Sequence, residues 1–290
     1  MKLRAGLTAT LLAIGSGLAC AVPVEAGPDV DAGLNPGSRK PLWELGLGVA
    51  GLRLPDYRGS DQSRSYLLPL PYIVYRGTWL KADRDGARAL LVDTQRVKVD
   101  VSVAASTPTR SRDNVAREGM PNLAAVGEIG PNLNLTLAAS AADRWRLDLR
   151  LPLRAAVTLQ RSPKFIGTTF SPHLNLDLGG VGGGWNVGLL TGPLFADRKY
   201  HEHFYDVDAA YATPERPAYK AHGGYAGWQA LTAASRRFGN TWVGGFVRYD
   251  SLRGAAFEDS PLVRRHSSLT FGFGVSWILA TSSELVQSSD

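Results

Sequence analysis

The sequence has one cysteine among its 290 residues, Cys20, which lies near the N-terminus. A lone cysteine excludes a framework of intramolecular disulfides, so the fold has to be stabilised by packing and hydrogen bonding. There is also no G-x-S-x-G motif, no H-E-x-x-H motif and no cysteine pair. The usual sequence signatures of serine hydrolases and of zinc sites are therefore missing.

Long hydrophobic runs are missing beyond the first twenty residues. No later stretch approaches the roughly 18 consecutive apolar residues of a transmembrane helix. The first residues combine a short basic head, an apolar stretch at 5–18 and the sequence Ala19-Cys20-Ala21. This is the pattern of a secretory signal peptide with an A-x-A cleavage site. We predict removal of residues 1–21, or of residues 1–26 if cleavage occurs after Val24-Glu25-Ala26.

No change in composition, charge run or Pro-Ser linker divides the rest of the chain. The mature chain, about 265 residues long, fits one large β domain or two small domains. Residues 22–41 are rich in Gly, Pro and Asp, and we expect a flexible periplasmic lead-in there. Loss of Lys2 and Arg4 lowers the formal charge from +6 to +4. This mild excess is weak support for a nucleic-acid partner, and we expect none.

The most informative segment is the run from Arg144 to Arg154, in which apolar and polar residues alternate strictly. Successive side chains of a strand point to opposite faces, so one face is apolar and the other is ionic. Similar alternation recurs along the chain, and no segment shows a helical period. The pattern predicts strands at 43–54, 66–75, 78–83, 86–92, 96–106, 122–138, 145–157, 169–178, 185–195, 224–238, 241–251 and 267–279.

Short and long connections alternate between these strands. Outer-membrane barrels of bacteria have short periplasmic turns and longer extracellular loops. A soluble sandwich is the alternative, but it does not explain that alternation. We therefore predict an all-β protein: a closed antiparallel transmembrane β-barrel of twelve strands at 42–279, followed by a tail at 280–290. Ten strands are the alternative count, because the pair 78–83 and 86–92 is short.

Aromatic and ionic residues fit the same arrangement. Six of the seven tryptophans fall at the ends of strands that would be periplasmic, where an interfacial girdle is expected. The girdle residues that share parity with the apolar faces are Trp43, Trp145, Trp185 and Trp277. A lipid-facing arginine costs roughly 2–4 kcal/mol near the bilayer midplane, so the ionic side chains should face inward. The predicted lumen network consists of Arg146, Asp148, Arg150, Arg154, Arg248 and Asp250.

The loop 196–223 is the longest and the richest in aromatic residues. Its candidate functional residues are Tyr200, Phe204, Tyr205, Arg216 and Tyr219, which either plug the barrel mouth or recognise a ligand outside. His201, Glu202, His203 and His222 raise the question of a metal site. Because two histidines at i and i+2 in an exposed loop are usually only solvated, we predict no metal, no cofactor and no catalytic residues.

Several segments, taken in order, resemble the MipA/OmpV family of outer-membrane proteins, named for the MltA-interacting protein. They are Gly46-x-Gly48, Pro55-x-Tyr57-x-Gly59-Ser60, Leu68-Pro69-Leu70-Pro71-Tyr72, Gly119-Met120-Pro121, 148–154, 192–197, Tyr200, Phe204-Tyr205-x-Val207, Arg216-Pro217-x-Tyr219, Gly224-Tyr225, 248–255 and 259–263. Each motif is weak alone, but the ordered set covers the mature chain. The chain departs from many outer-membrane barrels in extending beyond its last aromatic strand end, Trp277-Ile278-Leu279.

The resemblance implies a non-enzymatic barrel that holds a murein synthase and a lytic transglycosylase together during cell-wall growth. Its surroundings would be outer-membrane lipid and lipopolysaccharide. The residues leave two other functions open. One is a small-solute channel or surface receptor that uses the lumen and the long loops, and the other, much weaker, is a surface hydrolase.

Overall fold

The computed structural model describes residues 39–76, 80–83, 86–94 and 96–287. Side chains are described for all of these except 80–93 and 287. The strands are β1 (Arg39–Pro41), β2 (Trp43–Pro55), β3 (Ser63–Arg76), β4 (Leu80–Asp83), β5 (Gly86–Asp93), β6 (Val97–Ser106), β7 (Val126–Ser140), β8 (Trp145–Thr158), β9 (Phe165–Phe170), β10 (His173–Gly180), β11 (Trp185–Ala196), β12 (Gly224–Phe238), β13 (Thr241–Ser251), β14 (Ser267–Thr281) and β15 (Leu285–Gln287). The helices are α1 (Val181–Gly184), α2 (Arg198–Tyr205), η1 (Ser111–Asp113), η2 (Val115–Arg117) and η3 (Ala209–Tyr211).

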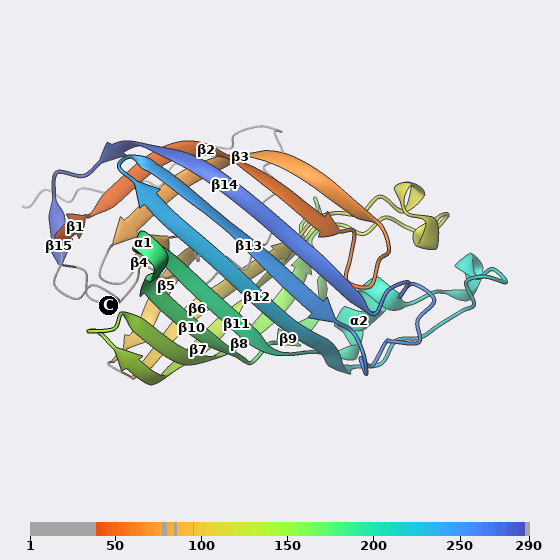
Figure 1. The fold of residues 1–290 in the computed structure, drawn as a ribbon. Helices are drawn as coiled ribbons and strands as arrows, with labels where there is room; N and C mark the ends of the chain where they lie inside the picture. The colour runs from red at the N-terminus through yellow and green to blue at the C-terminus, as the bar shows by residue number, and fades with distance from the viewer. Residues whose placement is uncertain (1–38, 77–79, 84–85, 95, 288–290) are drawn as a thin grey trace, which may run out of the picture.

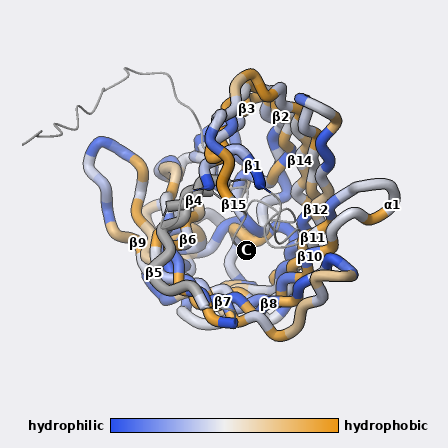
Figure 2. The backbone as a smooth tube through the Cα atoms, turned by 90° about the vertical axis from the view of Figure 1, so that its left-hand side faces the viewer, coloured by the Kyte–Doolittle hydropathy of each residue, from blue (hydrophilic) through white to orange (hydrophobic). Residues whose placement is uncertain are grey.

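Within these residues, thirteen strands form one antiparallel sheet, so the prediction of an all-β fold is confirmed. The order is β10-β11-β12-β13-β14-β2-β3-β4-β5-β6-β7-β8-β9. Its ends carry additional pairings: β10 also pairs with β8, and β11 with β9. The long strands are inclined in a common direction in Figure 1, and Figure 2 shows β2 and β3 on the opposite side of the molecule from β7 and β8. No helix in the described part of the chain is long and apolar enough to cross a membrane.

The two ends of the sheet differ, as the sequence predicted. Tight connections such as 141–144, 181–184 and 239–240 lie at one end, which we call the turn end. Long connections lie at the other, the loop end, where α2 is found (Figure 1). The loop end carries residues 56–62, 107–125, 159–164, 197–223 and 252–266.

The two faces of the sheet differ in polarity. On β10, His173, Asn175 and Asp177 are buried on the inner face, whereas Leu174 on the outer face is 42% exposed. On β14, Phe273 is 64% exposed and its neighbour in sequence on the opposite face, Gly274, is buried. Large exposed apolar side chains recur on the outer face of most long strands. The outer face thus carries exposed apolar side chains along most of its long strands, whereas soluble monomers rarely expose large contiguous apolar patches.

Three predicted segments differ from the structure. The strand predicted at 169–178 is two strands, β9 and β10, broken at 171–172, because Pro172 has no N–H to donate to a neighbouring strand. The strand predicted at 122–138 begins only at Val126, since 122–125 belong to the preceding loop. Strands were not expected beyond 279, but β15 pairs with β1 in a separate two-stranded sheet at the turn end. The predicted signal peptide and most of the lead-in lie outside the described residues.

Candidate functional site

The loop end is closed over by a hydrophobic core built from four loops. We call residues 56–62, 107–125, 197–223 and 252–266 the cap. Side chains from all four loops, together with Ala226 of β12, meet in one buried cluster: Tyr57, Leu123, Tyr205, Val207, Ala221, Ala226, Leu252, Ala255, Phe257 and Leu262. Loops that pack through their own core have a defined position over the sheet.

Two tyrosines anchor this core. The Tyr205 ring stacks on Phe257 with centroids 3.7 Å apart, and its hydroxyl donates to the Arg58 carbonyl oxygen at 2.9 Å. Burial raises the pKa of Tyr57 to about 12, so its hydroxyl remains a donor, here to the Leu262 carbonyl oxygen at 2.8 Å. Both hydroxyls are satisfied without water, which lets the aromatic rings be buried at little cost.

The N-cap residue of helix α2, Asp197, also binds strand β9. The Asp197 carboxylate accepts from the backbone N–H of Tyr200 at 2.8 Å. It also accepts from the backbone N–H and the hydroxyl of Thr168, each at 2.8 Å. Gly167 has φ +127°, and a Cβ there would lie 2.2 Å from the same carboxylate. A glycine is therefore required where β9 meets the start of α2.

Asp197→Ala is expected to loosen α2, because it removes the helix N-cap and the link to Thr168. The loss should be about 1–2 kcal/mol of local stability. The measurement is the rate of limited proteolysis within 198–222 in the folded protein, followed by mass spectrometry. Asp208→Ala is the matched control, because Asp208 is exposed and makes no side-chain cap bond at the start of η3. Equal rates for the two variants would show that Asp197 does not hold the helix.

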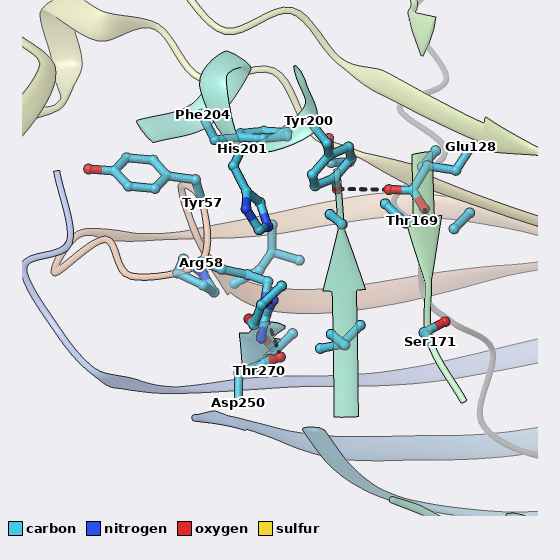
Figure 3. A pocket seen from close by; sticks show the side chains of 18 of the residues that line it. Tyr57, Arg58, Glu128, Thr169, Ser171, Tyr200, His201, Phe204, Asp250 and Thr270 are labelled. Atoms are coloured by element: carbon cyan, nitrogen blue, oxygen red, sulfur yellow. Dashed lines mark hydrogen bonds and ion pairs between the residues drawn. The ribbon is translucent and has the colours of Figure 1, made fainter. Parts of the chain in front are cut away.

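Beneath α2 lies a cavity of about 220 Å³, which we call the chamber. Its lining combines strand residues of the inner face with residues of the cap (Figure 3). Tyr200, His201 and Phe204 reach it from α2, so the helix forms its roof. The chamber therefore brings together segments separated by most of the length of the chain.

Two carboxylates of the chamber are held by several partners each. Glu128 accepts from the Tyr200 hydroxyl at 2.8 Å and from the Thr169 hydroxyl at 2.9 Å. Asp250 receives Arg58 at 3.1 Å and Arg248 at 3.0 Å. Burial raises the pKa of Tyr200 well above its usual value, and the charge of Glu128 raises it further, so this hydroxyl stays protonated as a donor. Charged groups buried with such partners keep a fixed geometry.

The prediction that the histidines of loop 196–223 are merely solvated is wrong for His201. This residue is completely buried, because α2 turns it toward the chamber and the Phe257 ring, 4.6 Å away between centroids. Its Nδ1 lies 2.6 Å from the His222 carbonyl oxygen, which can only accept, so Nδ1 carries the hydrogen. Burial lowers the pKa of His201, and it lowers the pKa of His203 to about 4. Both rings are neutral at pH 7. Among the described residues, no group of three or more His, Cys, Asp or Glu side chains comes together as a metal site.

The six residues predicted as a lumen network all lie on the inner face of the sheet. Arg146 pairs with Asp148 at 3.0 Å, and Arg150 lies 4.0 Å from Asp148 and 3.9 Å from Asp177 on the adjacent strand. Arg154 donates to the Ser102 hydroxyl at 2.9 Å. The structure separates the six into two groups: Arg146, Asp148 and Arg150 lie nearer the turn end, whereas Arg154, Arg248 and Asp250 line the chamber.

The five loop residues predicted as a plug or a recognition element occupy different positions in the cap. Tyr200, Phe204 and Tyr205 come from α2 and face the chamber. Arg216 instead ties its loop to residues 107–125, since its guanidinium donates to the Ala116 and Glu118 carbonyl oxygens at 3.1 and 2.8 Å. Tyr219 packs against the cap core. The structure thus directs most of these groups to the protein interior.

The predicted tryptophan girdle lies at the turn end. Trp43, Trp145 and Trp185 begin β2, β8 and β11, and Trp277, near the end of β14, is 50% exposed. Trp242 differs, because it packs inward against Tyr72 with ring centroids 6.3 Å apart. Trp79, also counted in the predicted girdle, lies outside the described residues.

Several chamber residues were not singled out from the sequence. Arg58 follows Tyr57 in a loop, where no periodicity indicates which way a side chain points. Glu128 does share the parity of the polar side chains Asn132 and Asn134 on β7, a signal that was available. Ser171 lies at the break between β9 and β10, where the alternation predicted one continuous strand over 169–178.

One known protein family matches most of the chain. Residues 47–279 match the family described as MltA-interacting protein MipA. No match was found among curated proteins. The matched region begins within β2, ends within β14 and includes the cap and the chamber. The chain therefore belongs to the MltA-interacting protein MipA family.

Proposed function

We propose that this protein is a closed β-barrel of the outer membrane that acts as a non-enzymatic scaffold for a lytic transglycosylase, and with it a murein synthase. The observation that carries the proposal is the family match over 47–279, because the family is described by its interaction with MltA, a lytic transglycosylase. The signal peptide predicted from residues 1–21 supports export to the compartment where murein is found.

The barrel itself is supported by the sheet and by its surface. The pairings of β8 with β10 and of β9 with β11 link the ends of the strand order, as a closed barrel requires. The outer face carries apolar side chains and the inner face carries ionic ones, the arrangement expected in lipid around a wet or filled lumen. Counting β9 and β10 as one bent strand gives twelve strands, or ten if the short pair β4 and β5 does not cross the membrane.

The partner enzyme would meet the turn end. In an outer-membrane barrel the short turns face the periplasm, where murein-cleaving enzymes act. The turn end also carries the β1–β15 pair and the tryptophans at the strand starts. The loop end would face outward, and its cap would take no part in binding the enzyme.

Binding to a purified MltA-type lytic transglycosylase tests the scaffold. The intact protein in detergent should bind the enzyme in biolayer interferometry, above the signal of an unrelated outer-membrane barrel. A variant lacking 200–219 of the cap should bind equally well, because the deletion is confined to the loop end. Binding no stronger than that of the unrelated barrel would reject the scaffold function. Binding lost only in the variant without 200–219 would place the interface at the loop end and contradict the proposed turn-end interface.

A second candidate function, a receptor or channel for a small solute, is favoured by one observation. The chamber is a cavity of about 220 Å³ that lies beneath α2. Most small-molecule sites are concave, largely preformed and lined by aromatic groups with a few polar ones. A scaffold that only binds an enzyme at the turn end does not require such a cavity.

A further inference from the structure

The charged groups around the chamber leave an excess of positive charge. Arg58, Arg154 and Arg248 border it, against Glu128 and Asp250. Asp56 also borders it, but that carboxylate is compensated by Arg64, 2.7 Å away. In a partly enclosed cavity one uncompensated charge is screened less than in open solvent, so it has a larger effect on a ligand.

The acidic groups are already occupied. Both oxygens of Glu128 accept hydrogen bonds, from the Tyr200 and Thr169 hydroxyls. Both oxygens of Asp250 bind Arg248, and Oδ1 also binds Arg58. A cationic ligand would have to compete with these donors for the carboxylate oxygens. The chamber is therefore poorly suited to a cation.

Four buried polar atoms on the chamber lining have no hydrogen-bond partner among the described residues. They are Arg58 Nη2, Ser106 Oγ, Ser171 Oγ and His201 Nε2. Ser171 and His201 are 2% and 0% exposed. In Figure 3 the His201 ring points from α2 toward Arg58. Buried polar groups are nearly always paired, so four unpaired ones around one cavity indicate that a bound molecule supplies their partners.

The chemistry of these atoms specifies the ligand. Arg58 Nη2 can only donate, and a guanidinium N–H is best matched by a carboxylate oxygen. His201 Nε2 can only accept, because the hydrogen of the neutral ring is on Nδ1, so it requires a hydroxyl or N–H donor. The hydroxyls of Ser106 and Ser171 can each donate or accept. The complementary molecule carries one anionic oxygen group and at least one hydroxyl group.

The volume limits the size of this molecule. A cavity of about 150 Å³ accommodates benzene, so about 220 Å³ suits a molecule on the order of ten non-hydrogen atoms. We propose that the chamber is a binding site for a small hydroxylated carboxylate, of the size of a sugar acid, held by Arg58, Ser171 and His201. This rests on the second candidate function above and names its class of solute.

Three ring-matched probes test the proposal by calorimetric titration of the intact protein in detergent. Glucuronate is the anion, glucose its neutral counterpart and glucosamine its cationic counterpart. Glucuronate should bind at least tenfold more tightly than glucose, and glucosamine should show no binding. Arg58→Gln should weaken glucuronate binding about tenfold or more, as expected when a hydrogen bond from a charged donor is lost. Ser171→Ala should weaken it severalfold without disturbing an ion pair.

Arg198→Gln is the matched control for the loss of an arginine. Arg198 lies on α2, the helix of His201, but it is exposed and paired with Glu202 outside the chamber. It should leave glucuronate binding unchanged. If Arg58→Gln fails to fold, as judged by gel mobility before and after heating, Ser171→Ala alone decides. Equal binding of glucuronate and glucose would overturn the anion site while leaving a solute receptor. If none of the three probes binds, both the anion site and the solute-receptor function would be overturned. The scaffold function would be unaffected, because binding to the lytic transglycosylase tests it separately.

Discussion

Leu149→Arg is expected to reduce sharply the amount of folded protein in the outer membrane, whereas Arg150→Leu should reduce it little. Leu149 lies on the outer face of β8, between Leu135 of β7 and Leu174 of β10. In the proposed barrel, an arginine there would face lipid at a cost of roughly 2–4 kcal/mol. That is a large share of the 5–15 kcal/mol by which a folded domain is usually stable.

The neighbouring substitution is milder for a structural reason. Arg150 reaches its two carboxylates only at 4.0 and 3.9 Å. When it is removed, Asp148 keeps Arg146 at 3.0 Å, and Asp177 keeps the Asn175 amide at 2.9 Å. Asp148 therefore keeps a cationic partner and Asp177 keeps a hydrogen bond in place of a long ion pair, so the cost should stay below that of an arginine facing lipid.

The fraction of protein whose gel mobility shifts on heating measures assembly of both variants in the same membranes. Leu151→Arg and Pro152→Leu form a second such pair, two residues further along β8, with Leu151 on the outer face and Pro152 on the inner face. Leu151→Arg should again be the more damaging of the two. If Arg150→Leu proved the more damaging, the assigned facing of β8 and the lipid-facing role of the apolar surface would both be wrong.

The alternation in the sequence was sufficient to predict most strands and the facing of their side chains. It is a local signal: Leu149 and Arg150 lie on opposite faces whatever the neighbouring strands are. The same reasoning predicted the inward position of Arg146, Arg150 and Arg154. It also predicted which end has the long connections, because connection lengths can be read directly from the strand positions.

The cap could not be predicted in this way, because non-local contacts determine its structure. Helix α2 is only eight residues long, too short for a helical period to stand out, and it depends on Asp197 binding Thr168 and Tyr200. The burial of His201 follows from that helix and from Phe257, which is 56 positions away in the sequence. The chamber was missed for the same reason, since its lining comes from loops and strands throughout the chain.

The β1–β15 pair shows the same limit at the other end of the molecule. Its strands are three residues each, and they join the two ends of the described chain. Neither Arg39–Pro41 nor Leu285–Gln287 is long enough to show alternation. Each is a strand only because the other is beside it.

Deleting residues 200–219 is expected to raise the single-channel conductance of the protein in planar bilayers severalfold. The deletion removes most of α2 and the aromatic residues that roof the chamber, among them Tyr205, whose ring stacks on Phe257. The two segments that the deletion joins run close together, because Gly223 lies against the backbone of Arg198. With the roof gone, ions would reach the charged inner face from the loop end.

The control is removal of 212–215, the exposed tip of the same loop, which leaves α2 and the cap core in place. Its conductance should equal that of the intact protein, so a rise confined to the larger deletion would assign the seal to α2. Unchanged conductance in both variants would indicate that the barrier to ions lies deeper in the lumen than α2. The remaining barriers would be the ionic pairs around Asp148 and the aromatic contact of Trp242 with Tyr72 near the turn end. Because a lumen of this size can be filled by side chains alone, that outcome would favour the scaffold over the solute receptor.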